Sequence, residues 1–139
     1  MSDGIQRFIE AQKRSYDTAL EEIKRGKKRS HWMWYIFPQM KGLGHSSTAQ
    51  YYGIENRKEA EKYLAHPILG SRLLEISKEL LKLESNDPRA VMGEPDNWKL
   101  KSCMTLFETV SNEPVFGQVL DKFFGGERDK ATVEMLRDH

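Results

Sequence analysis

Apolar residues recur at spacings of three and four along nearly the whole chain, and this periodicity constrains the fold more than any other feature. The clearest run spans residues 69–83, where leucine and isoleucine would share one face of a helix. Residues 5–23 show the same spacing. No stretch alternates strictly between apolar and polar residues, and no Asn-Gly or Asp-Gly turn separates two strand-like runs. The pattern predicts an all-α protein with no sheet of three or more strands.

Helix start and stop signals divide this pattern into segments. Prolines occur where the first turn of a helix is expected, a position that suits proline: Pro67, Pro88 and Pro114. Asp96 and Asp129 are expected to cap two further helices, and Gly125-Gly126 to end the helix between them. We expect one compact domain over residues 1–139, built from about six to eight orthogonally packed helices.

Length and composition fit a soluble globular domain. The 139 residues can bury a sizeable core, and 31% charged with 38% hydrophobic residues is typical of a folded chain. The net charge of +1 argues against nucleic acid as a partner. No apolar run approaches the roughly 20 residues that span a bilayer, and the N-terminus lacks a signal-peptide pattern. With Cys103 as the single cysteine, no internal disulfide can form, and we expect a cytoplasmic protein.

The segment 29–39, Arg-Ser-His-Trp-Met-Trp-Tyr-Ile-Phe-Pro-Gln, is the densest cluster of rare residues, and the basic run 24–29 leads into it. Aromatic surface with polar tips beside positive charge suits a planar or anionic ligand, although a core segment has the same composition. Trp32 and Trp34 would lie about 200° apart on a helical wheel. One is therefore expected in the core, and the other against a groove or a neighbouring helix.

Two polar residues are the candidates for catalysis. His31 has a reference pKa near neutrality and could transfer protons, while the alternative is a structural histidine bonded to backbone. Residues 96–105 form a second polar stretch, in which Lys99, Ser102 and Thr105 fall at helical spacings. We predict that His31 and Lys99 lie in one cleft; the alternative places Lys99 on a solvated outer face.

The residues expected to bind a ligand around this pair are polar or aromatic: Arg29, Ser30, Trp32, Trp34, Gln39, Ser102 and Thr105. In this hypothesis Lys99 and Arg29 hold negative charge, and one tryptophan stacks on the ligand. The four histidines show neither i, i+4 pairing nor an HExxH motif, so no metal site is expected, and no cofactor either.

Several motifs resemble those of a known bacterial family. The segment 29–39 followed by Gly-Leu-Gly at 42–44 is similar to the hallmark of the family catalogued as domain of unknown function 1810. Other segments that resemble it are 66–73, 99–107, 116–125 and 129–132. The resemblance spans nearly the whole chain. It implies a compact all-helical domain and carries no established activity.

Two functions stay open at this point. The first is a small-ligand-binding domain, either a binding protein or an enzyme acting on an anionic or nucleotide-like metabolite. The second is a non-catalytic protein-interaction module that uses the aromatic segment as a groove or dimer interface. Either function would fit a monomer or a homodimer. A groove with convergent polar groups would favour the first function, and a flat apolar patch the second.

Overall fold

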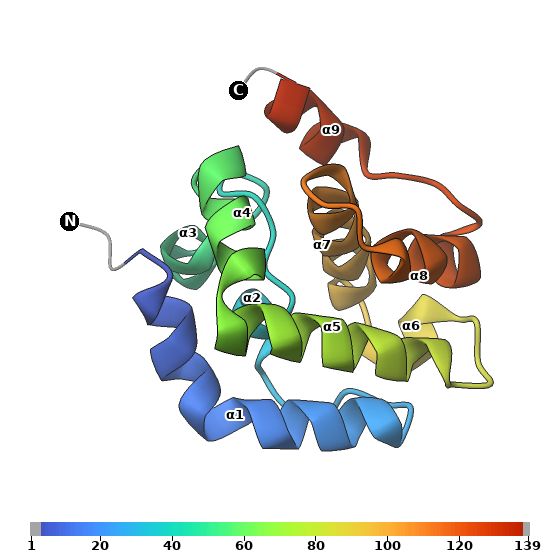
Figure 1. The fold of residues 1–139 in the computed structure, drawn as a ribbon. Helices are drawn as coiled ribbons and strands as arrows, with labels where there is room; N and C mark the ends of the chain where they lie inside the picture. Colours follow the sequence, from blue (N-terminus) through green and yellow to red (C-terminus); the bar gives the residue numbers. More distant parts are fainter. Residues whose placement is uncertain (1–3, 138–139) are drawn as a thin grey trace.

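The computed structural model describes residues 4–137, and these form nine helices and no strand (Figure 1). In chain order they are α1 (Gln6–Lys24), α2 (Met33–Ile36), α3 (Ser47–Tyr52), α4 (Arg57–Ala65), α5 (Pro67–Leu81), α6 (Pro88–Met92), α7 (Asp96–Thr109), α8 (Pro114–Phe124) and α9 (Lys130–Arg137). The all-α prediction is confirmed. The expected six to eight helices are too few, because α2, α3 and α6, with four to six residues each, form separate elements.

One hydrophobic cluster draws side chains from α1 through α9, between Phe8 and Leu136. Helix α5 packs against α1, α4 and α8, and α7 packs against α8, α9, α6 and α4 (Figure 1). Residues 102–107 of α7 are all buried. A helix that other helices cover on most of its faces must bury its polar residues as well as its apolar ones. Helix α7 therefore carries buried hydroxyls as well as core side chains.

Side-chain caps begin five of the helices within residues 4–137, and the expected cap at Asp129 is among them. The side chains that accept hydrogen bonds from first-turn backbone amides are Ser46, Asn56, His66, Asp87 and Asp129. The expected cap at Asp96 is wrong: Pro95 precedes α7 as its N-cap, and Asp96 is the first helical residue. Its carboxylate is instead paired with two lysines. Partners from elsewhere in the fold thus override a local capping preference.

The loop after α2 is tied to the segment between α3 and α4. Met40 and Ile54 form an isolated parallel bridge, in which the Ile54 amide donates to the Gln39 carbonyl over 2.9 Å. Gly44 is close-packed, because a Cβ there would lie 2.6 Å from the Cβ of Ala49. These contacts tie the loop to α3 and to the segment before α4. Within residues 4–137, no helix combines the length and the apolar character that crossing a membrane requires.

Candidate functional site

A groove of about 370 Å³ lies between the loop after α2, the first two turns of α7 and the residue before α9. We call it the α7 groove; its lining residues are Gln39, Leu43, Gly44, Pro95, Trp98, Lys99, Ser102 and Asp129. A void of about 10 Å³ that borders Trp34 and Phe37 shares Gln39 and Lys99 with it. The groove therefore joins parts of the chain that are far apart in sequence.

Lys99 supplies positive charge to the α7 groove. Its ammonium lies 3.6 Å from one carboxylate oxygen of Asp96, while the ammonium of Lys28 lies 2.9 Å from the other. Lys28 and Lys99 thus share the carboxylate of Asp96, and Lys28 makes the shorter contact. Lys28, Lys99 and Asp96 together carry one net positive charge, and Lys99 is the cation of the three that lines the groove.

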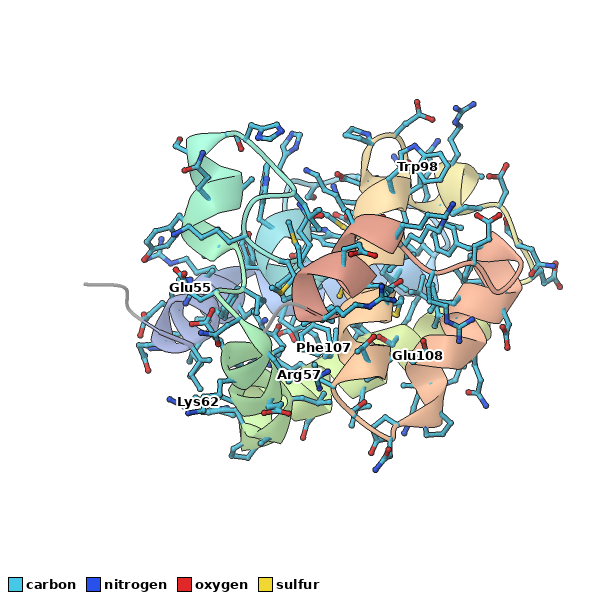
Figure 2. The ribbon with its side chains drawn as sticks, turned by 90° about the horizontal axis from the view of Figure 1, so that it is seen from above. Glu55, Arg57, Lys62, Trp98, Phe107 and Glu108 are labelled. Carbon is cyan, nitrogen blue, oxygen red and sulfur yellow. The ribbon has the colours of Figure 1, made fainter. Side chains whose placement is uncertain are left out.

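Trp98 gives the groove an accessible aromatic ring. Its side chain lies at the start of α7 and is 54% exposed, the largest value among the large hydrophobic residues described. Figure 2 shows it toward the edge of the molecule, whereas Phe107 of the same helix lies near the centre. Lys101 lies over this ring at 5.8 Å from its centroid, and is paired with Glu127. An exposed indole beside a cation suits stacking with a planar group.

Gln39 and Ser102 place neutral polar groups in the same groove. Within residues 4–137 the Gln39 side-chain amide makes no hydrogen bond, so it can still donate and accept. The Ser102 hydroxyl donates to the carbonyl of Trp98 over 3.2 Å, which leaves its oxygen able to accept. Both residues were expected to bind a ligand, and both line the groove.

The two tryptophans of the aromatic segment separate as the helical spacing predicts. Trp32 is 1% exposed and belongs to the core. Trp34 is half-buried, and the ammonium of Lys99 lies 5.3 Å from its ring centroid. Trp34 therefore contacts Lys99 beside the groove.

Around Glu22, the first half of the aromatic segment forms a closed arrangement, which we call the carboxylate cluster (Glu22, Arg29, Ser30 and Trp32). Glu22 Oε1 accepts from the amides of Arg29 and Ser30 and from the indole nitrogen of Trp32, over 2.7–2.9 Å. Oε2 accepts from the Ser30 hydroxyl. Burial alone would raise the pKa of Glu22, but these hydrogen bonds outweigh it and lower the pKa to about 2. Ser30 and Trp32 thus hold a loop in place and do not line the α7 groove.

Besides Trp34, which lies beside the groove, three other expected site residues also lie outside its lining. The side chains of His31 and Arg29 are exposed, and within residues 4–137 neither makes a hydrogen bond or an ion pair. Thr105 is fully buried; its hydroxyl donates to the Lys101 carbonyl over 2.8 Å and accepts from the Asp129 amide over 2.9 Å. The structure thus brings Lys99 together with Trp34, Gln39 and Ser102, but not with His31.

Sequence reasoning missed five lining residues of the groove, of which Trp98 and Asp129 are the two with an aromatic or charged side chain. Trp98 directly precedes Lys99 in a polar stretch, and an aromatic residue in such a place is a usable signal. Asp129 was interpreted only as a helix cap, a role that it does fill. Its position opposite α7 depends on contacts that no local pattern reveals.

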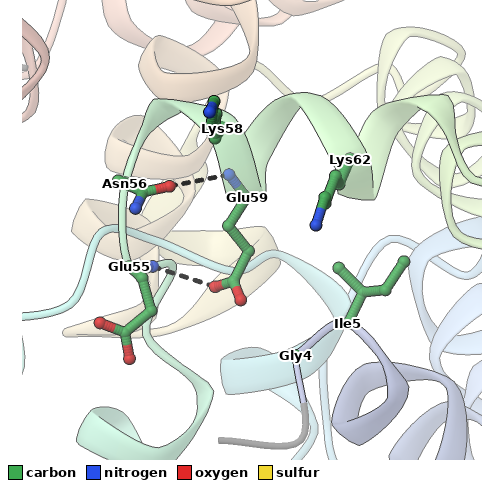
Figure 3. Close-up of a pocket in the computed structure, with 7 residues that line it drawn as sticks. All are labelled: Gly4, Ile5, Glu55, Asn56, Lys58, Glu59 and Lys62. Atoms are coloured by element: carbon green, nitrogen blue, oxygen red, sulfur yellow. Dashed lines mark hydrogen bonds between the residues drawn. The ribbon is translucent and has the colours of Figure 1, made fainter.

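Other parts of the fold offer less for chemistry. A larger groove, about 560 Å³, lies between α4 and the start of the described chain (Figure 3). Its Glu59 accepts from the Glu55 amide and pairs with buried Arg7, and its Asn56 caps α4. Cys103 is fully buried, which raises the pKa of its thiol. Among residues 4–137, no three His, Cys, Asp or Glu side chains are grouped to hold a metal ion.

Comparison with known proteins identifies the family. The family described as protein of unknown function DUF1810 matches residues 2–136, and the chain belongs to it. The chain is similar to the crystal structure of the conserved hypothetical protein Rv1873 from Mycobacterium tuberculosis, at 40% sequence identity and a TM-score of 0.94 over 96% of each chain. No curated protein matches it.

Proposed function

We propose that the protein binds a small ligand in which a planar ring carries an anionic group, and that the α7 groove is the binding site. The observation that carries the proposal is that the positive charge of Lys99 and the exposed ring of Trp98 line the same groove. A cation and an aromatic face in one groove are complementary to the two parts of such a ligand. Anionic or nucleotide-like metabolites have this composition.

Each polar group of the groove has a role in this proposal. The Lys99 ammonium binds the anionic group, and Trp98 stacks on the ring, a contact that contributes about 1–3 kcal/mol when nucleobases stack on aromatic side chains. The Gln39 amide and the Ser102 hydroxyl orient the ligand by hydrogen bonds. If the protein is an enzyme, Lys99 is the group that would stabilise negative charge developing during the reaction.

The alternative of a protein-interaction module receives less support. Such a module would present the aromatic segment on the surface, as a groove or a dimer interface. In this segment Trp32, Met33 and Phe37 are each 1% exposed, and Ile36 is 2% exposed. These side chains pack within the core, so little of their apolar surface is accessible to a protein partner. Small metabolites are cytoplasmic solutes, and the ligand-binding proposal fits the cytoplasmic location that we infer from the sequence.

Calorimetric titration with ring-bearing and ring-free anions tests the proposal. The panel is AMP, CMP, GMP, UMP, phenyl phosphate and inorganic phosphate. At least one ring-bearing anion should bind, and Lys99→Met should weaken that binding at least tenfold. Trp98→Ala should reduce the affinity for that ligand but not for inorganic phosphate. The matched control is Lys82→Met, which removes a lysine that is 70% exposed and lies outside the groove. The absence of binding at millimolar concentrations, or equal binding by Lys99→Met, would refute the proposal.

A further inference from the structure

Asp129 is held rigidly at the wall of the α7 groove by two buried threonines. Its backbone amide donates to the Thr105 hydroxyl over 2.9 Å. Its Oδ2 accepts from the amide of Thr132 over 3.1 Å and also from the Thr132 hydroxyl. Thr105 and Thr132 are both 0% exposed. Buried partners on both sides fix the carboxylate in place, as expected of a group whose position has been set before a ligand binds.

The second carboxylate oxygen of Asp129 has no such partner. Within residues 4–137, Oδ1 takes part in no hydrogen bond or ion pair. The buried side-chain atoms without a partner include Asn97 Oδ1 but not this oxygen, so solvent reaches it. The groove that Asp129 lines also contains Lys99 and Trp98. A residue whose carboxylate has one unpaired oxygen thus lines the same groove as a cation and an aromatic ring.

This acceptor narrows the class of ligand. A bound ligand displaces water from the groove, and an ionised carboxylate that loses its water without gaining a donor is costly. An aromatic anion without hydroxyl groups has no hydrogen-bond donor for Asp129, and its negative charge is repelled by the carboxylate. A ligand with hydroxyl groups between its ring and its anionic group can donate to Asp129 while Lys99 holds the anion. A ribose connects the base and the phosphate of a nucleotide in this way.

We infer that Asp129 is a specificity-determining residue that accepts hydrogen bonds from ribose hydroxyls, and that the ligand is a ribonucleoside monophosphate. The inference rests on the proposed function, since it requires that the α7 groove binds a ring-bearing anion. The base stacks on Trp98, the phosphate pairs with Lys99, and the 2′- and 3′-hydroxyls donate to Asp129 Oδ1. The groove, at about 370 Å³, falls within the usual range for small-molecule sites.

The test compares two ligands and two proteins by calorimetry. The ligands are whichever of AMP, CMP, GMP and UMP binds most tightly and its 2′,3′-dideoxy form. The proteins are the native chain and Asp129→Asn, a change that keeps the size of the side chain and an N-cap acceptor for α9. Asp129→Ser is the second variant, in case the amide disturbs folding, because serine also caps helices. Thermal melts within a few degrees of the native chain show that the fold is intact.

The native protein should bind the ribonucleotide about tenfold more tightly than the dideoxy form, and Asp129→Asn should abolish most of this difference. Equal affinity for both ligands in the native protein would overturn the inference, as would an equal loss for both in Asp129→Asn. Binding of phenyl phosphate but of no nucleotide would overturn it while leaving the proposed function standing. If no ring-bearing anion binds, the proposed function fails as well.

Discussion

The carboxylate cluster and the α7 groove contain the same kinds of residue, yet only the groove has capacity left for a ligand. At each region a lysine contacts a tryptophan: Lys28, next to the cluster, lies 4.9 Å from the centroid of Trp32, and Lys99 of the groove lies 5.3 Å from that of neighbouring Trp34. Both lysines share Asp96. The side chain of Lys28 is 8% exposed and also donates to the Ser30 carbonyl, whereas that of Lys99 is 23% exposed.

The difference teaches that residue type alone does not mark a site. In the carboxylate cluster every polar group that approaches Glu22 has been used to hold the loop, and little donor capacity remains. In the α7 groove the Gln39 amide and one oxygen of Asp129 have no partner among residues 4–137. Unused hydrogen-bonding capacity at an accessible surface is what a ligand needs.

The largest expected effect separates the two tryptophans. Trp32→Ala should cost about 3–5 kcal/mol of unfolding free energy, because it opens a cavity in the core and removes a donor to Glu22. Trp34→Ala, at a half-buried position, should cost less than half as much and should weaken ligand binding instead. Urea unfolding of both variants measures the two losses. Equal, small losses would mean that the two regions do not differ as described.

A second test uses the pH dependence of stability. The pKa of Glu22 is lowered from 4.5 to about 2 in the folded protein, so the unfolded chain binds the proton more readily. Its ionised form therefore stabilises the fold by about 3 kcal/mol above pH 4.5, and this contribution is lost as the pH falls toward 2. Glu22→Gln should be less stable at pH 7 and should lose that part of the acid dependence. Urea unfolding between pH 7 and pH 3 measures it; parallel pH curves for both proteins would contradict the prediction.

A smaller loss of stability and affinity is expected at Thr105, a buried residue that supports Asp129 at the wall of the α7 groove. Thr105→Val keeps the side-chain shape but leaves the Asp129 amide without its acceptor, at a cost of about 1–3 kcal/mol. The proposed binding should weaken too, because Asp129 loses one of its two supports. Thr109→Val is the matched control: its hydroxyl also bonds to an α7 carbonyl, over 2.7 Å, but has no contact with Asp129. Similar losses in stability and affinity for both variants would argue against a supporting role for Thr105.

The smallest effect is expected at His31. This exposed side chain makes no hydrogen bond within residues 4–137 and does not line the α7 groove, so His31→Ala should change stability by no more than about 0.5 kcal/mol. Ligand affinity should be unchanged as well. Thermal melts and the same titrations provide the measurement. A strong loss of binding would mean that His31 contributes to the ligand site, and that the aromatic segment and the α7 groove are not separate in function.

The sequence by itself determined the secondary structure and where several helices begin. Apolar spacing predicts the helical segments, and Pro67, Pro88 and Pro114 lie in the first turn of a helix, where they were expected. The spacing of Trp32 and Trp34 correctly predicts that one of them is core. These features depend on interactions within about four residues along the chain, and such interactions can be inferred from a single sequence.

Only the tertiary structure decided which polar residues are free. In the sequence, Ser30 and Trp32 have the composition of ligand-binding residues. In the structure, their side chains donate hydrogen bonds to Glu22, eight to ten positions away. The sequence shows Asp129 only as a helix cap. The structure adds a hydrogen bond from its amide to Thr105, 24 positions away, which holds it beside the α7 groove. Periodicity and capping signals carry no information on which distant donor and acceptor meet. The packing of the helices and loops against one another sets those pairs, and with them the groups that stay available to a ligand.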